Sequence, residues 1–138
     1  MIGIVITGHG SYPFGMYESI RLIAGDVEGL KTIPFQEDQE QLERALIEAI
    51  EQVDTGSGVV CFADLAGGTP FNISSKIAVK KDNVRVIGGT NSPMLLSSLF
   101  QREQSLDEFV NHALNEGKMN IKPFEIVKKE KEENSDGI

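Results

Sequence analysis

Residues 5–15 of the chain read VITGHGSYPFG, and they join the end of an apolar run to the start of a helical pattern. His9 stands between two glycines at the point where the run ends. Ser11 and Pro13 follow, and a capping residue before proline in the first turn is typical of a helix N-terminus. The stretch therefore predicts a buried strand that passes through a tight turn into a helix, with a histidine at the turn.

The same succession of a short apolar run and a helical segment recurs along the chain. The runs are IGIVIT, LKTIPF, GVVCFA and VRVIG at residues 2–7, 30–35, 58–63 and 84–88. Each precedes a segment of helical period, which indicates βαβ units around a mostly parallel sheet. We therefore expect a doubly wound α/β fold with helices on both faces of the sheet.

Capping residues and prolines predict where several helices begin. Residues 39–53 carry apolar side chains at three- and four-residue steps behind Asp38, which we expect to be the N-cap. Thr69 before Pro70, and Asn91 two residues before a proline, are expected to cap two further helices in the same way.

The C-terminal part of the chain contains a helix, a strand and a polar segment. The helix is expected to begin at Ser105 and to end at Gly117. Residues 120–127 (NIKPFEIV) have strand character and would add an antiparallel strand at an edge of the sheet. Residues 128–138 are too polar to pack and are expected to form a tail or the stub of a linker, which leaves 1–127 as one domain.

Proline placement predicts the order of the strands. Pro34 and Pro123 each remove a backbone hydrogen-bond donor, which favours edge positions, whereas the runs at 2–7 and 58–63 are suited to the buried centre. The predicted order is 2-1-3-4, with the C-terminal strand beside strand 4. A ligand crevice is expected beyond the carboxyl ends of strands 1 and 3, where the direction of winding reverses.

Composition argues against several classes of protein. The 138 residues carry a formal net charge of −8, whereas binding to nucleic acid depends on clustered Lys and Arg. The single cysteine, Cys61, lies inside an apolar run and can form no internal disulfide. The sequence shows neither a leader pattern nor a run of membrane-spanning length, so we expect a cytoplasmic protein.

Two loops of the predicted crevice carry the candidate site. His9 ends strand 1, and Asp64 follows strand 3 within ADLAGGTPFN. A carboxylate that accepts a hydrogen bond from Nδ1 fixes the tautomer of a histidine and leaves Nε2 as a nucleophile. The helix starts nearby favour an anion. The backbone N–H groups expected to cradle that anion belong to Gly10, Ser11, Gly67 and Gly68. This arrangement suits a phosphoryl group on the histidine.

The absence of certain motifs from the sequence limits the types of reaction that this site could catalyse. The chain has no G-x-x-x-x-G-K-[ST] loop, and neither crevice loop contains a Lys or Arg to neutralise a triphosphate. Asp64 is the only carboxylate in these loops, so we expect no metal, and no diffusible cofactor is implied. A carrier that receives and surrenders a phosphoryl group therefore fits better than an ATP-using kinase.

The sequence resembles the enzyme IIA component of the mannose family of the bacterial sugar phosphotransferase system. The likeness runs from Met1 to about Val127 and rests on IVITGHG, FADLAGGTPFN and GGTNSPML. It implies that His9 takes a phosphoryl group from HPr through Nε2 and passes it to a histidine of enzyme IIB. The membrane components would be reached indirectly, through enzyme IIB. The family's orienting aspartate matches Asp64, and its hydroxyl residue matches Thr69, which would contact the phosphoryl group.

The resemblance also implies a homodimer in which residues 120–127 are exchanged between subunits. Gly8 precedes the histidine where some members carry threonine, and Thr7 lies one step earlier, so a hydroxyl contact from that side is in doubt. The transported sugar is chosen by other components, and mannose, fructose, sorbose, amino sugars and gluconate all occur in the family.

Two other functions stay open on the sequence alone. A sensor of small ligands would use the same crevice without needing a free Nε2. A hydrolase would use His9 as general base and Ser11 or Thr69 as nucleophile, although neither hydroxyl lies in a G-x-S-x-G turn. The second histidine, His112, is expected on a solvated helix face.

Overall fold

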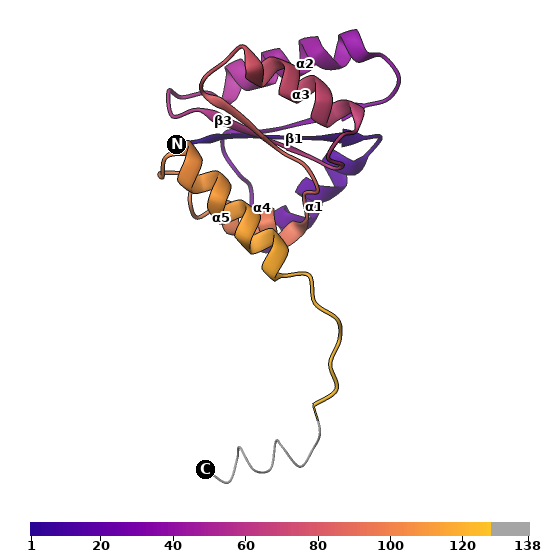
Figure 1. Cartoon of the computed structure of the whole chain (residues 1–138), viewed down its shortest axis with the longest axis vertical. Coiled ribbons are helices and arrows are strands. Elements are labelled where there is room, and N and C mark those ends of the chain that lie inside the picture. The colour runs from indigo at the N-terminus through magenta and orange to yellow at the C-terminus, as the bar shows by residue number, and fades with distance from the viewer. Residues whose placement is uncertain (128–138) are drawn as a thin grey trace.

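A parallel sheet lies at the centre of the computed structural model, which describes residues 1–127 (Figure 1). Its strands are β1 (Gly3–His9), β2 (Leu30–Phe35), β3 (Val59–Ala63) and β4 (Val84–Ile87). Their order is β2-β1-β3-β4, and all neighbouring pairs are parallel. The predicted α/β class and strand order are confirmed, and β1 and β3 occupy the centre as expected.

Helices cover both faces of this sheet. Figure 1 shows α2 (Gln39–Val53) and α3 (Thr69–Val79) on one face, and α1 (Tyr12–Ala24), α4 (Ser92–Ser98) and α5 (Leu106–Met119) on the other. Side chains alternate along a strand, so Ile4 and Ile6 pack with the second set of helices whereas Val5 packs with the first. Burial on both faces explains the unbroken apolar runs of the central strands.

Most of the predicted helix starts are found where they were expected. The Asp38 carboxylate accepts hydrogen bonds from the N–H groups of the second and third residues of α2, at 3.0 and 3.2 Å. Asn91 and Ser105 cap α4 and α5 through their side chains. The prediction for Thr69 is wrong by one residue, because Gly68 is the N-cap of α3 and Thr69 is its first helical residue.

Helix α5 continues to Met119 instead of ending at Gly117. Gly117 is buried, and a Cβ atom at this position would lie 2.6 Å from Cε of Met94 in α4. The glycine therefore allows two helices to approach closely and does not terminate the helix. None of the helices in residues 1–127 is both long and apolar enough to cross a membrane.

The expected antiparallel edge strand is not formed in this structure of a single chain. After α5 the chain leads away from the sheet (Figure 1), and residues 121–127 form no strand and are exposed. Their exposed apolar side chains are Ile121, Phe124, Ile126 and Val127. The prediction for residues 128–138 lies outside the described part of the chain, so the boundary after 127 stays a prediction.

Candidate active site

The carboxyl ends of the two central strands bring His9 and Asp64 together. Thr7 of β1 pairs with Ala63 of β3, so the residues that follow lie at one edge of the sheet. Nδ1 of His9 lies 2.8 Å from Oδ2 of Asp64, and the backbone N–H of His9 donates to the same oxygen at 2.9 Å. The histidine side chain is 46% exposed, and its Nε2 has no hydrogen-bond partner within residues 1–127.

The Asp64 carboxylate is held firmly and stays ionised. Its side chain is only 11% exposed, and its second oxygen accepts a hydrogen bond from the N–H of Leu65 at 2.8 Å. Burial alone would raise the pKa of Asp64, but the hydrogen bonds from His9 and Leu65 and the charge of His9 together lower it. An ionised carboxylate keeps the proton on Nδ1, which leaves the lone pair on the exposed Nε2.

Two glycines allow this close arrangement. A Cβ atom on Gly8 would lie 2.5 Å from Cδ1 of Tyr12 and 3.0 Å from Cγ of Asp64. A Cβ atom on Gly68 would lie 3.3 Å from Cε1 of His9, which is the ring carbon between the two nitrogens. The histidine and its carboxylate therefore lie against backbone that carries no side chain.

The aromatic ring of Phe35 also contacts the histidine. Phe35 is opposite His9 in the β1–β2 register, and the two rings meet edge to face with centroids 5.7 Å apart. The histidine ring is thus bounded by Phe35, Gly68 and the Asp64 carboxylate, while its Nε2 edge remains open.

Two of the four expected backbone donors already have acceptors. The N–H of Gly10 donates to the carbonyl of Phe35 at 2.8 Å, and that of Gly68 donates within its own loop at 3.2 Å. The N–H groups of Ser11 and Gly67 have no acceptor within the described part of the chain. Gly10 and Gly68 therefore provide space and turn geometry, and Ser11 and Gly67 are the free donors.

The N-termini of α1 and α3 flank the histidine, and neither has a side-chain cap. Free N–H groups and the helix dipole at such ends favour an anion. Thr69 is half-buried in the first turn of α3. In residues 1–127 the ring of His9 makes no hydrogen bond to the hydroxyl of Ser11 or Thr69, so no contact supports the hydrolase alternative.

Two other predictions are settled by hydrogen bonds. The Thr7 hydroxyl donates to the carbonyl of Ile33 at 2.8 Å and is fully buried, so it does not reach the Nε2 side of His9. His112 is half-buried, and its Nε2 contacts the Ser97 hydroxyl at 2.5 Å. The expectation of a solvated His112 is therefore wrong, because α4 packs against this face of α5.

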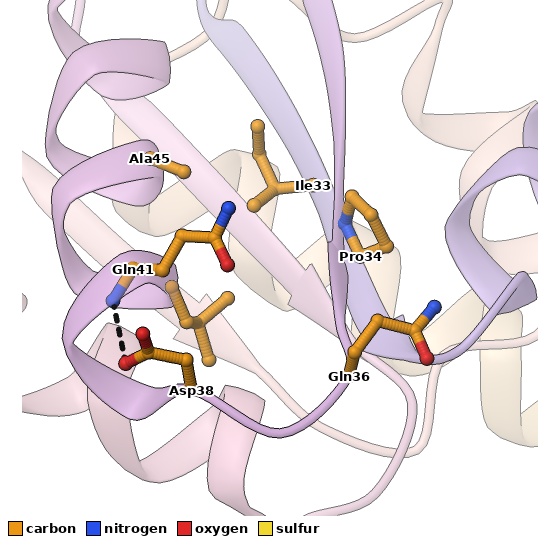
Figure 2. Close-up of a pocket in the computed structure, with 7 residues that line it drawn as sticks. Ile33, Pro34, Gln36, Asp38, Gln41 and Ala45 are labelled. Carbon is orange, nitrogen blue, oxygen red and sulfur yellow. Dashed lines mark hydrogen bonds between the residues drawn. The ribbon is translucent and has the colours of Figure 1, made fainter.

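A cavity of about 170 Å³ lies between β2 and the first turns of α2 (Figure 2). Its lining consists of Ile33, Pro34, Gln36, Asp38, Gln41, Leu42 and Ala45. Neither His9 nor Asp64 lines it, so the reactive edge of the histidine faces solvent and not this cavity. Within the described residues no group of three or more His, Cys, Asp or Glu side chains could hold a metal ion.

Sequence reasoning missed Tyr12, which lies near the Asp64 carboxylate. Its ring packs beside the backbone of Gly8, and its hydroxyl donates to the carbonyl of Thr90 at 2.8 Å. In the sequence Tyr12 looks like any aromatic residue that packs at a helix start, and no motif marks it.

The fold and the site together define a class: doubly wound α/β proteins with a carboxylate-oriented histidine exposed at the switch point of the sheet. The model of the EIIA-man family, described as "PTS system fructose IIA component", matches residues 3–114. The chain therefore belongs to the EIIA-man family and is an enzyme IIA phosphoryl carrier of the mannose, fructose and sorbose type of phosphotransferase system.

Individual relatives agree with this assignment. The chain is 34% identical over 134 residues to the mannose-specific EIIAB component of Escherichia coli. The matched region covers 94% of this chain but only 42% of that protein. It is 29% identical over 115 residues to the fructose-specific EIIA component of Bacillus subtilis, covering 81% and 79% of the two chains. The crystal structure of an EIIA component from Streptococcus agalactiae superposes with a TM-score of 0.83 at 30% identity, covering 90% and 98%.

Proposed function

We propose that His9 accepts a phosphoryl group from phospho-HPr on Nε2 and passes it to a histidine of enzyme IIB, in sugar uptake coupled to phosphorylation. The observation that carries the proposal is the pairing of Nδ1 with the ionised Asp64 at 2.8 Å, while Nε2 stays free and exposed. HPr and enzyme IIB are the partners that membership of the family implies.

The transfer needs no proton to move. The Nε2 lone pair attacks phosphorus, the new N–P bond forms, and the histidine nitrogen of the donor keeps the electron pair of the bond that breaks. The ring then carries positive charge, which the Asp64 carboxylate stabilises through Nδ1–H. Transfer to enzyme IIB reverses these steps, with Nε2 of His9 as the leaving nitrogen.

The phosphoryl oxygens would be stabilised by groups around His9. Ser11 and Gly67 have free N–H groups, and the uncapped starts of α1 and α3 point positive dipole ends toward the site. The Thr69 hydroxyl, in the first turn of α3, would contact one oxygen. Positioning and charge stabilisation of this kind account for most of the catalysis in phosphoryl transfer.

The sugar would be a hexose or a related derivative, since the relatives above carry the names of mannose and fructose systems. We place the exchange in the cytoplasm, with the membrane components reached only through enzyme IIB. This chain spans about two fifths of the length of the E. coli EIIAB component.

The decisive experiment is incubation with enzyme I, HPr and phosphoenolpyruvate, followed by intact mass at neutral pH and after brief acid. One added phosphate that acid removes is expected for the natural chain and for His112→Ala, and none for His9→Ala. Phosphorylation of His9→Ala at the natural rate would overturn the proposal. Phosphorylated HPr with an unmodified natural chain would do the same.

We also propose that residues 120–127 add an antiparallel strand to a second copy of the chain. Support comes from four large apolar side chains that are 60–89% exposed over residues 121–127 of the single chain. Light scattering on the purified protein should give the mass of a dimer. Phe124→Asp should shift that mass toward the monomer, whereas Glu125→Gln, at a polar position on the opposite face of the strand, should not.

A further inference from the structure

Tyr12 packs beside Gly8, close to the Asp64 carboxylate. It is the first residue of α1, and its ring is so close to Gly8 that a Cβ atom there would lie 2.5 Å from Cδ1. The same Cβ atom would lie 3.0 Å from Cγ of Asp64. The tyrosine ring and the Asp64 carboxylate therefore pack against the backbone of Gly8 from two directions. The ring helps to bury the carboxylate.

The hydroxyl of Tyr12 connects the histidine loop to the aspartate loop. It donates to the carbonyl of Thr90 at 2.8 Å, and the N–H of Thr90 in turn donates to the carbonyl of Ala63 at 3.2 Å. Ala63 immediately precedes Asp64. Two hydrogen bonds thus join the start of α1, three residues after His9, to the residue before Asp64 by way of the loop that follows β4.

We propose that Tyr12 is a positioning residue for phosphoryl transfer, which holds the His9–Asp64 pair in register through the Thr90 bridge and excludes water from the carboxylate. This inference rests on the proposed function of His9. Apart from this bridge, the segments that carry His9 and Asp64 are held by the strand ladders, by the contacts of the pair itself and by the backbone hydrogen bonds of Gly10 and Gly68.

A direct chemical role for Tyr12 does not fit the structure. Its hydroxyl is directed to a backbone carbonyl and makes no hydrogen bond to His9 or Asp64. Burial and, to a smaller extent, the charge of Asp64 raise the pKa of Tyr12 to about 12, so the phenol stays protonated and remains a donor to Thr90. Its effect on the reaction therefore passes through Asp64.

The test compares Tyr12→Phe with Tyr17→Phe in the full chain. Both changes remove one hydroxyl from a partly buried tyrosine of α1, and the Tyr17 hydroxyl accepts a hydrogen bond from the N–H of Val27 at 3.3 Å, away from the site. Three quantities are measured: the melting temperature, the rate of phosphorylation by phospho-HPr, and the ¹⁵N chemical shifts of Nδ1 and Nε2 of His9. The nitrogen shifts report the tautomer and need no partner protein.

Tyr12→Phe is expected to lower the phosphorylation rate about three- to tenfold, the size expected when one hydrogen bond is lost. It should also raise the share of the tautomer that carries its proton on Nε2. Tyr17→Phe should change melting alone. Equal rates and equal nitrogen shifts in the two variants would overturn the proposal. If the natural chain takes no phosphate, the proposed function fails, whereas the nitrogen shifts still decide whether Tyr12 positions the pair.

Discussion

A single oxygen atom of Asp64, Oδ2, accepts hydrogen bonds from both the backbone N–H and the ring Nδ1 of His9, at 2.9 and 2.8 Å. The backbone bond fixes the point from which the histidine side chain extends, and the ring bond fixes the direction that Nε2 faces. Because one carboxylate makes both bonds, position and tautomer of His9 depend on the same residue.

Asp64→Asn should leave the fold intact and slow phosphorylation of His9 by about 10²- to 10⁴-fold. An amide is nearly the same size as the carboxylate, but its NH₂ group can donate to Nδ1 and so place the proton on Nε2. Rapid-quench measurement of phosphate transfer from phospho-HPr checks the rate, and circular dichroism checks the fold. A rate within threefold of the natural protein would show that the carboxylate is dispensable.

The contribution of Asp64 to stability should depend on pH in a defined direction. The pKa of Asp64 is lowered in the folded state from its ordinary value of 3.8, so the folded protein favours the ionised form. This stabilisation is complete above pH 3.8 and is lost as the pH falls through the lowered folded-state value. Urea unfolding of the natural chain and of Asp64→Asn, compared from pH 7 to acid, should show the difference shrinking only at the acidic end.

Gly8→Ala should destabilise the protein by about 1–3 kcal/mol, because the new methyl group would clash with the Tyr12 ring and the Asp64 carboxyl group. Gly15→Ala is the matched control, since nothing lies within 4 Å of a Cβ atom at that position in α1. It should stabilise the chain by about 0.5–1 kcal/mol through helix propensity. Equal effects of both changes in urea denaturation would contradict the crowding inferred at Gly8.

His112→Ala should reduce stability by about 0.5–1.5 kcal/mol, since it removes the hydrogen bond to Ser97 between α5 and α4. Its rate of phosphorylation should equal that of the natural chain, because the His112 ring pairs with Ser97 of α4 and makes no hydrogen bond to His9 or Asp64 within the described residues. Thermal melting combined with the transfer assay separates the two effects. A lower phosphate stoichiometry in this variant would indicate a second acceptor.

The strands and their order follow from sequence features that act locally. Unbroken apolar runs mark β1 and β3 as buried on both faces, and Pro34 on β2 marks an edge. From that order alone His9 and Asp64 must lie at one edge of the sheet. The pairing of Nδ1 with the carboxylate further depends on Gly8 and Gly68, which leave room for the two side chains.

Other features depend on contacts that no local pattern encodes. Gly117 has the form of a helix terminator, but its place is set by Met94 of α4. Tyr12 contributes through Thr90, which is 78 residues away in the chain. Residues 120–127 have the pattern of a strand, yet in the single chain residues 121–127 form no strand and leave their apolar side chains exposed.

Cys61 lies in the middle of β3 with no exposed surface, and burial raises the pKa of its thiol to about 12. A thiol in this state reacts with alkylating reagents only after the central sheet has opened. Because the sequence contains no other cysteine, the natural chain carries one built-in chemical reporter of global opening. The rate at which Cys61 is alkylated measures how often the folded core opens, and this rate can be compared with and without a phosphoryl group on His9. The measurement requires no engineered probe.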